Sequence, residues 1–205
     1  MPAFDLFSIG HSNVPADRFL AALQNAGVNT IADVRSAPFS RFFPWFSQKP
    51  LAAKLSESRI AYTFMGGALG GRPRHEHLYC DGIADYEAMA TETEFRGGLQ
   101  RLIDAVAQSR ICLVCAEREP LDCHRCLLVT RYLAERGLTI GHILHDGTIE
   151  PHAATERRLL ALYDDDCDLF EAGHASRLAA AYRRRAKAVA FRHKRSSSRR
   201  AAEKR

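Results

Sequence analysis

Apolar and polar positions along the first 163 residues form a pattern that predicts strands and helices in turn. Short apolar runs of strand length occur at residues 4–9, 30–34, 61–64, 111–114 and 139–144. Helices are predicted at residues 16–26, 50–58, 94–108, 123–136 and 151–163, and residues 94–108 give the clearest amphipathic stripe. Such alternation is typical of a parallel sheet covered by helices. We therefore expect an α/β fold with a mostly parallel sheet of about five strands and helices on both faces.

The chain after residue 163 has a different composition. Residues 164–168 read DDDCD, an acidic break, and residues 174 to about 194 predict a basic helix. The final SSSRRAAEKR is rich in Ser, Arg and Lys and is expected to be disordered. We therefore divide the chain into an α/β domain at residues 1–163 and a C-terminal part at residues 164–205 that holds the acidic break, the basic helix and a disordered basic tail.

The formal charge of +5 is unevenly distributed along the chain. Residues 183–205 hold 11 Lys and Arg against one Glu, a charge of +10, which leaves −5 for residues 1–182. A basic arm of this kind binds the phosphates of nucleic acid, and a solvated tail without a specific partner is the alternative. The charge distribution slightly favours nucleic acid.

Composition and the first residues of the chain indicate the compartment in which the protein is expected. A hydrophobic content of 46% suits a globular domain, and no apolar run approaches the roughly 20 residues that span a bilayer. The first residues lack the basic and apolar regions of a signal peptide, so we expect a cytoplasmic protein without a membrane partner. The six cysteines are then expected to be reduced thiols. The sequence leaves the oligomeric state open.

The stretch from residue 111 to residue 133 is the densest in reactive groups. It passes from an apolar strand through a polar loop into an amphipathic helix, a place where α/β proteins bind ligands. The start of the following helix offers free N–H groups to an anion, and Asp122 or Cys123 is expected to begin it. Within eleven positions this stretch brings together Cys115, Glu117, Asp122, Cys123, His124 and Arg125.

Two other predicted strands also end in polar residues. His11 and Ser12 follow the first strand, and Asp33 and Arg35 lie at the end of the second. In a parallel sheet the carboxyl ends of strands meet at one edge. We therefore expect one pocket that contains His11, Asp33, Arg35, Glu117 and His124.

Two predicted loops could complete this pocket. Residues 37–48 set aromatic rings around Ser40 and Arg41, which suits either a hydrophobic lid or the stacking of bases, and the lid is favoured. Residues 66–82 include Gly70 and Gly71, which allow close backbone approach, followed by Arg72 and Arg74, which can meet phosphate.

The chain has enough Cys and His for a metal site, but the spacing of these residues argues against one. His75, His77 and Cys80 could combine with Cys115, Cys123 and His124 in a tetrahedral set. The C-x2-C pairs, however, are Cys112 with Cys115 in a strand, where an offset of three points to opposite faces, and Cys123 with Cys126 in a helix. We therefore expect no metal and no cofactor.

Five ordered motifs give the chain a resemblance to a known family. They are SIGHS at residues 8–12, DVR at 33–35 followed by SR at 40–41, LGG at 69–71, CAE at 115–117 and CHR at 123–125. Over roughly residues 4–150 the chain resembles the prokaryotic family of the domain of unknown function 488. The resemblance implies a compact α/β domain whose shared polar residues gather at strand ends, and it names no activity.

Function is predicted from the residues expected at the pocket. Arginines can hold an anionic substrate while carboxylates and imidazoles hydrolyse a bond, so we expect a hydrolase of a nucleotide or nucleic acid that acts on an N-glycosidic bond. A non-catalytic nucleic-acid-binding module is the alternative, and thiol redox chemistry ranks last. The expected catalytic residues are Glu117, Asp33, His124 and His11. The expected substrate-binding residues are Ser12, Arg35, Ser40, Arg41, Gly70, Gly71, Arg72, Cys115, Cys123 and Arg125.

Overall fold

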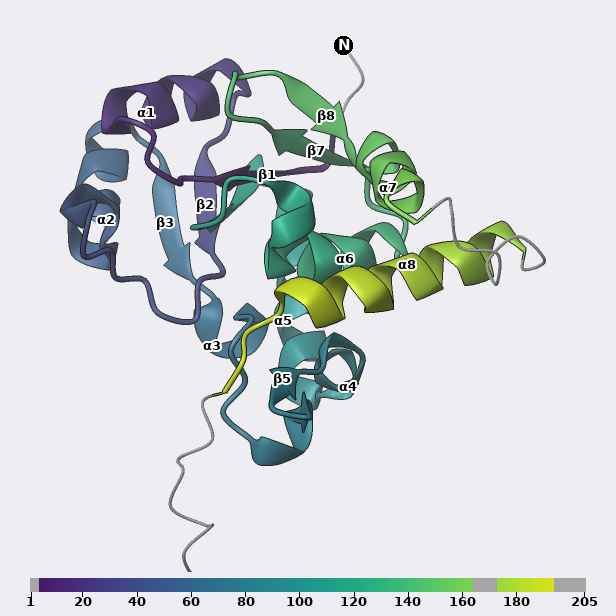
Figure 1. The fold of residues 1–205 in the computed structure, drawn as a ribbon. Helices are drawn as coiled ribbons and strands as arrows, with labels where there is room; N and C mark the ends of the chain where they lie inside the picture. Colours follow the sequence, from purple (N-terminus) through teal and green to yellow (C-terminus); the bar gives the residue numbers. More distant parts are fainter. Residues whose placement is uncertain (1–3, 164–172, 194–205) are drawn as a thin grey trace, which may run out of the picture.

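The computed structural model describes residues 4–163 and 173–193. Its centre is a six-stranded sheet in the order β3-β2-β6-β1-β7-β8 (Figure 1). The first five of these strands are parallel, and β8 runs antiparallel to β7 at one edge. The mostly parallel α/β fold predicted from the sequence is confirmed. The strands are β1 (Leu6–Gly10), β2 (Thr30–Asp33), β3 (Ala61–Phe64), β6 (Ile111–Cys115), β7 (Ile140–Ile143) and β8 (Ile149–Pro151).

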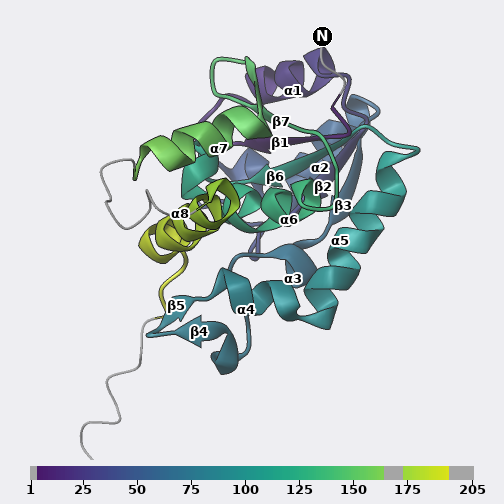
Figure 2. The ribbon, with the colours of Figure 1, turned by 90° about the vertical axis from the view of Figure 1, so that its right-hand side faces the viewer.

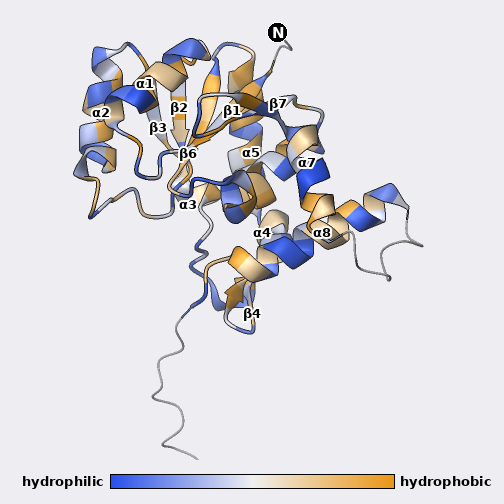
Figure 3. Ribbon diagram, turned by 45° about the horizontal axis from the view of Figure 1, so that its top comes forward, coloured by the Kyte–Doolittle hydropathy of each residue, from blue (hydrophilic) through white to orange (hydrophobic). Residues whose placement is uncertain are grey.

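Helices cover both faces of the sheet, as predicted. One face packs against α1 (Ala16–Asn25) and α2 (Gln48–Glu57), whose buried side chains include Phe19, Leu23 and Leu55. The other face carries α5 (Thr93–Val106), α6 (Arg131–Ala134), α7 (His152–Ala161) and α8 (His174–Val189). Hydrophobic strands lie at the centre, and polar residues colour the outer sides of the helices (Figure 3). Each face therefore buries its own apolar cluster.

Strand β6 shows how one strand serves both faces. Cys112 packs in the cluster beneath α1 and α2, while Cys115 packs in the cluster on the opposite face. This confirms the expected alternation, because side chains three positions apart in a strand point in opposite directions. Cys112 and Cys115 therefore cannot bind one ion together.

Two parts of the chain are more regular than the sequence predicted. A short antiparallel strand, β8, follows a turn in which Asp146 accepts a hydrogen bond from the Thr148 hydroxyl at 2.7 Å. The segment 66–82, expected to be irregular, forms α3 (Gly66–Leu69), a 3-10 turn at Glu76–Leu78 and β4 (Tyr79–Cys80), which pairs with β5 (Ile83–Ala84). With α4 (Tyr86–Thr91), this hairpin lies below the main sheet (Figure 2).

The helix after β6 also differs from the prediction. A 3-10 turn at Pro120–Asp122 comes first, Cys123 is extended, and a π-helix spans Arg125–Thr130 before α6. The Thr130 hydroxyl donates to the carbonyl of Cys126 at 3.3 Å, the carbonyl that an α-helical amide of residue 130 would use. Asp122 lies in the 3-10 turn and His124 precedes the π-helix, so Asp122 does not cap this helix. The Asp122 carboxylate instead pairs with Arg185.

The connections leave β1 and β6 in opposite directions. From β1 the chain runs through α1 to β2, and from β6 it runs through the π-helix and α6 to β7 on the other side of β1 (Figure 1). β1 and β6 are neighbours, with Gly10 beside Cys115, and the amide of His11 donates to the Cys115 carbonyl at 2.9 Å. In open α/β sheets such a reversal opens a crevice beyond the strand ends, where ligands bind.

The predicted basic helix is α8, and it packs on α7 through Ala181 and Tyr182. Ala186 and Ala190 are also buried, and the Arg185 Nε donates to the Leu121 carbonyl at 3.0 Å. The helix that carries these basic residues is thus packed against the rest of the molecule, so a truncation at residue 183 would remove core and not only charge. The acidic break at residues 164–168 and the tail at residues 194–205 lie outside the described residues. Among the described helices, none has the length and apolarity to cross a bilayer.

Candidate functional site

A cavity of about 460 Å³ lies at the carboxyl ends of β1, β2 and β6. Its position agrees with the crevice expected where the connections reverse. Four residues predicted to share a pocket line it, namely His11, Arg35, Glu117 and His124. The rest of the wall consists of Ser36, Ala37, Phe39, Ser40, Gly71, Arg72, Tyr86, Cys115, Ala116, Asp122, Val189 and Phe191.

Asp33, the fifth residue predicted for this pocket, lies behind the wall. Its side chain is fully buried, and Arg35 binds both of its oxygens, through Nε at 2.8 Å and through a terminal nitrogen at 2.5 Å. The Tyr62 hydroxyl donates to the same carboxylate at 2.7 Å. With these contacts Asp33 orients Arg35 and has no oxygen free to act on a substrate.

Arg35 and His11 form the wall beyond Asp33. One Arg35 terminal nitrogen donates to the Phe46 carbonyl at 2.7 Å and lies 3.2 Å from His11 Nε2. The His11 ring stacks on Phe46 with 4.2 Å between ring centroids. Burial, together with the charge of Arg35, lowers the pKa of His11 to about 4. His11 is therefore a neutral imidazole near neutral pH, and its Nε2 accepts the Arg35 hydrogen bond.

Another part of the wall holds Cys115 and Glu117, and the buried Cys123 lies next to them. The Sγ atoms of Cys115 and Cys123 lie 2.9 and 3.0 Å from Glu117 Oε2. They also lie 3.7 and 3.9 Å from His124 Nδ1. The other His124 nitrogen, Nε2, is 2.9 Å from the Val34 carbonyl. Since a carbonyl only accepts, Nε2 carries the proton, and Nδ1 faces the sulfurs.

The sulfurs and the carboxylate of this wall are coupled in their protonation. Burial raises the pKa of Cys115 well above its usual value. Burial would also raise that of Cys123, but the hydrogen bond with Cys115 and the charges of Arg125 and His124 bring the pKa of Cys123 well below it. Burial and the Cys123 sulfur raise the pKa of Glu117. A sulfur 3.0 Å from a carboxylate oxygen requires a proton between them, so these groups share protons.

Arg125 supports this wall from within the protein and does not line the cavity. Its side chain is fully buried, and the two terminal nitrogens donate to the carbonyls of Glu117 and Arg118 at 2.6 and 3.0 Å. No carboxylate pairs with it among the described residues, and its Nε has no acceptor there. The guanidinium therefore fixes the path of the loop after β6.

Two glycines of the signature motifs permit close approach at this wall. A Cβ added at Gly10 would lie 1.8 Å from the Glu117 carbonyl oxygen, and one at Gly71 would lie 2.6 Å from the His124 ring. Any side chain at either position would displace these two residues. The prediction of close backbone approach at Gly71 thus applies to His124.

The sequence predicted only part of the aromatic side of the cavity, the loop at residues 37–48 that contains Phe39. Phe39, Tyr86 and Phe191 line it, and the Arg72 guanidinium lies 4.9 Å from the centroid of the Phe191 ring. Phe39 is 74% exposed. The signal for Phe191 was weak, because this residue is a single aromatic in a basic stretch far along the chain from the strand ends.

Several residues predicted to bind substrate lie away from the cavity wall. Ser12 and Arg41 are outside it, Gly70 lies beside a neighbouring hollow, and Cys123 is buried behind Cys115 and Glu117. Ser40, Gly71, Arg72 and Cys115 do line the wall. Arg74, His75 and His77 line or lie near the other hollow, where His77 pairs with Glu92.

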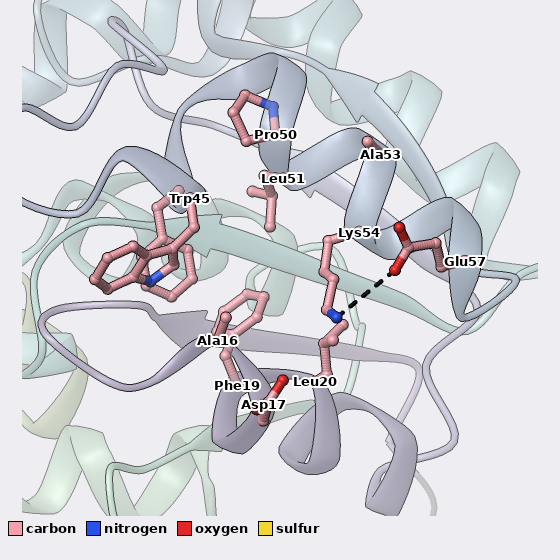
Figure 4. A pocket seen from close by; sticks show the side chains of 11 residues that line it. Ala16, Asp17, Phe19, Leu20, Trp45, Pro50, Leu51, Ala53, Lys54 and Glu57 are labelled. Atoms are coloured by element: carbon pink, nitrogen blue, oxygen red, sulfur yellow. Dashed lines mark ion pairs between the residues drawn. The ribbon is translucent and has the colours of Figure 1, made fainter.

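A second cavity, of about 300 Å³, lies between α1 and α2 (Figure 4). Carbon dominates its wall, with Leu20, Trp45 and Leu51 among the side chains shown. The Lys54–Glu57 ion pair, at 3.6 Å, satisfies two of its charges. This cavity lacks the convergent reactive groups of the cavity at the strand ends, which we therefore take as the candidate site.

Comparison with protein families gives a match to the family described as Domain of unknown function DUF488, over residues 15–132. The chain belongs to this family. The DUF488 match includes β2, β6, Glu117 and the π-helix, so most of the candidate site lies within the matched region. His11 and the cavity residues Val189 and Phe191 lie beyond it. Searches of curated proteins and of solved structures found no match.

Proposed function

We propose that this DUF488 protein is a hydrolase that cleaves an N-glycosidic bond in a nucleotide or in nucleic acid. The observation that carries the proposal is the position of Glu117, whose carboxyl group lies in the cavity wall with imidazoles and arginines around it. A positioned carboxyl group of this kind can pass a proton to a leaving group and take one from water.

The shape and charge of the cavity support a nucleotide unit as substrate. Phe39, Tyr86 and Phe191 offer aromatic surface to a planar base, and stacking on such rings tolerates any base. Arg72 lines the same wall, and Phe191 contacts it without occupying its hydrogen-bond donors. A phosphate next to the sugar could bind there.

The basic charge that follows Phe191 in the sequence supports nucleic acid as the larger substrate. Phe191 lines the cavity, and residues 194–205, with six Lys and Arg against one Glu, begin three residues after it. Positive charge on this part of the chain would attract the phosphates that flank the base. A cytoplasmic setting, where thiols stay reduced, is part of the same proposal.

The proposed mechanism uses a single carboxyl group, that of Glu117, because Arg35 holds both oxygens of Asp33. As the bond between C1′ and the base nitrogen breaks, its electron pair leaves with the base, and Glu117 donates a proton to that base. A water oxygen then bonds to C1′, and the water proton returns to Glu117. One water is added across the bond, and Glu117 ends in its starting state.

The test is release of free base from a panel of nucleotides and single-stranded and duplex oligonucleotides. Glu117→Gln should reduce turnover by about a hundredfold or more. Its melting temperature should stay near that of the wild type, because Arg125 binds the Glu117 carbonyl and not its carboxylate. Glu57→Gln, at an exposed carboxylate distant from the cavity, is the matched control.

Two results would contradict the proposal. Release of base at the wild-type rate by Glu117→Gln would exclude Glu117 as the acid. Binding of oligonucleotides without base release from any member of the panel would favour the alternative, a nucleic-acid-binding module in which the cavity only holds a base.

A further inference from the structure

Four potential metal ligands meet at the end of β6. Cys115 Sγ, Cys123 Sγ, His124 Nδ1 and a Glu117 carboxylate oxygen all lie within 4.8 Å of one another. They come from two short segments, residues 115–117 and 123–124, which the 3-10 turn at Pro120–Asp122 brings together. The sequence spacing argued against a metal site, because one C-x2-C pair lies in a strand and the other in a predicted helix, whereas this cluster takes one cysteine from each pair.

The distances within the cluster are close to those of a tetrahedral zinc centre. Bonds of about 2.3 Å to sulfur and about 2.0 Å to nitrogen put those ligand atoms about 3.5 Å apart at tetrahedral angles. His124 Nδ1 lies 3.7 and 3.9 Å from the two sulfurs. Glu117 Oε2 is nearer, at 2.9 and 3.0 Å, since shared protons hold it close to the sulfurs. An ion that replaced the thiol protons would push this oxygen outward by about half an ångström, toward the cavity.

The imidazole is oriented as metal-binding histidines are. The Val34 carbonyl accepts from Nε2, so that Nδ1 points at the sulfurs, where an ion would replace any proton on it. Gly71 packs directly against the ring and prevents it from rotating away. Both contacts hold His124 in place before any ion binds.

The buried charge next to the cluster also fits. Arg125 is a fully buried cation that lacks a carboxylate partner among the described residues, and a cation in such a place needs negative charge nearby. Two thiolates and the Glu117 carboxylate give three negative charges, while a divalent ion and Arg125 give three positive ones. The loaded cluster would be neutral as a whole.

We propose that Cys115, Cys123 and His124 bind a divalent transition-metal ion of the zinc class, with Glu117 at the fourth position, facing the cavity. Two thiolates and an imidazole select zinc over magnesium or calcium, which prefer oxygen ligands. With Glu117 bound the ion has four protein ligands, and release of Glu117 to act as the acid would open the fourth position to the cavity, the arrangement of catalytic zinc. The use of the ion to activate water at that position rests on the proposed function, whereas binding does not.

The other group of potential ligands in the described residues differs from this cluster. Cys126, His142 and His152 lie close together in the core. There both nitrogens of each imidazole already have hydrogen-bond partners, at distances from 2.7 to 3.1 Å. No nitrogen lone pair is left for an ion, so only the cluster at the cavity carries the proposal.

The first experiment measures the metal content of the full chain, purified under reducing conditions without chelators. We expect about one zinc per chain. Cobalt substituted for zinc should show thiolate-to-cobalt charge transfer and the intense visible bands of a four-coordinate ion. These measurements need no variant. A protein that holds no metal and fails to bind zinc or cobalt at micromolar concentration would overturn the proposal, as would a disulfide between Cys115 and Cys123 in place of the ion.

The second experiment compares cysteine variants. Cys115→Ser and Cys123→Ser should each weaken zinc affinity by about a hundredfold or more, and Cys80→Ser, at an exposed thiol outside the cluster, should not. Circular dichroism identifies variants that fail to fold. Full zinc affinity in folded Cys115→Ser or Cys123→Ser would also overturn the proposal.

The two proposals fail in different ways. Stoichiometric zinc without release of base leaves the metal site standing and removes the hydrolase. If metal-free protein still releases base at the full rate, the ion does not activate water. The proposed hydrolase activity then stands without the ion.

Discussion

Arg35 binds both carboxylate oxygens of Asp33, two residues before it in the chain, and both side chains are buried. The pair stands at the end of β2 and directs the remaining Arg35 nitrogen to the cavity wall, where it meets His11. Asp33 therefore acts through Arg35. This relationship assigns a structural task to a residue that the sequence placed among the catalytic ones.

Asp33→Asn should consequently lower stability. Arg35 would lose its charged partner while remaining buried, and such a loss typically costs about 3 to 5 kcal/mol. Urea denaturation measures the change. Asp104→Asn, at an exposed carboxylate that only accepts from Gln100, should change stability by less than about 0.5 kcal/mol. A normal unfolding midpoint for Asp33→Asn would show that the pair does not hold the end of β2.

The strand ends could be predicted because each rests on local periodicity. Apolar runs bounded by polar residues located β1, β2 and β6, and the rule for parallel sheets brought His11, Arg35 and Glu117 to one edge. A local ion pair between Asp33 and Arg35 is an alternative that the sequence raises, but the contact from Tyr62 on another strand could not be predicted. A sequence shows which groups reach an edge but not which of them satisfy one another.

The sequence named the thiols of the cluster as possible ligands, but their spacing led to a wrong rejection of their grouping, for a related reason. Cys123 and His124 come near Glu117 only because the loop after β6 folds back, and the buried Arg125 fixes that path through two carbonyls. Metal spacing rules assume regular turns, whereas this connection combines an extended residue with a π-helix. The approach of Phe191 to the cavity likewise depends on how α8 packs.

Arg72 and Arg74 give a matched pair for testing the anionic substrate. Arg72 lines the cavity, while Arg74, two residues later, lines the neighbouring hollow. Arg72→Gln should weaken binding of a nucleoside monophosphate by about 10- to 100-fold, the value of a lost hydrogen bond to a charged group. Arg74→Gln should leave it nearly unchanged. Calorimetric titration of both variants provides the comparison, and equal losses would indicate a diffuse surface attraction without a phosphate position.

A buried chain of hydrogen bonds makes stability depend on pH. The Ser8 hydroxyl donates to His142, His142 donates to His152, and His152 donates to Tyr182, at 2.7, 2.9 and 3.1 Å. Tyr182 in turn donates to Glu156 at 3.0 Å. Both imidazoles are neutral in this network of hydrogen bonds. Burial lowers the pKa of His152 to about 4 and that of His142 well below its usual value.

The unfolded chain therefore binds more protons than the folded one below pH 6.5, the ordinary value for His, and stability falls as the pH falls from there toward 4. His152 alone should account for about 3 kcal/mol over this window, at about 1.4 kcal/mol per unit of pKa. Glu150 and Glu156 lie close enough to reduce this effect. His152→Gln should be less stable at pH 7.5 but lose less on acidification. Urea denaturation between pH 7.5 and 4.5 measures both slopes, and parallel slopes would exclude His152 as a source of the dependence.

The tail tests whether nucleic acid is the partner. Because α8 is packed through Ala186 and Ala190, the informative truncation removes only residues 194–205, after the last described residue. Those residues carry six Lys and Arg and one Glu, and each phosphate contact contributes about 0.9 to the slope of log affinity against log salt on duplex DNA.

Removal of the tail should therefore flatten that slope by up to about 5 and weaken binding most at low salt, while the melting temperature stays the same. A variant with the six basic residues changed to Ser keeps the length and should behave like the truncation, which assigns the effect to charge. The slope of base release against salt should flatten in parallel if the tail holds the substrate that the cavity cleaves. An unchanged slope in both variants would remove the tail from binding and leave Arg72 and the cavity to select a free nucleotide.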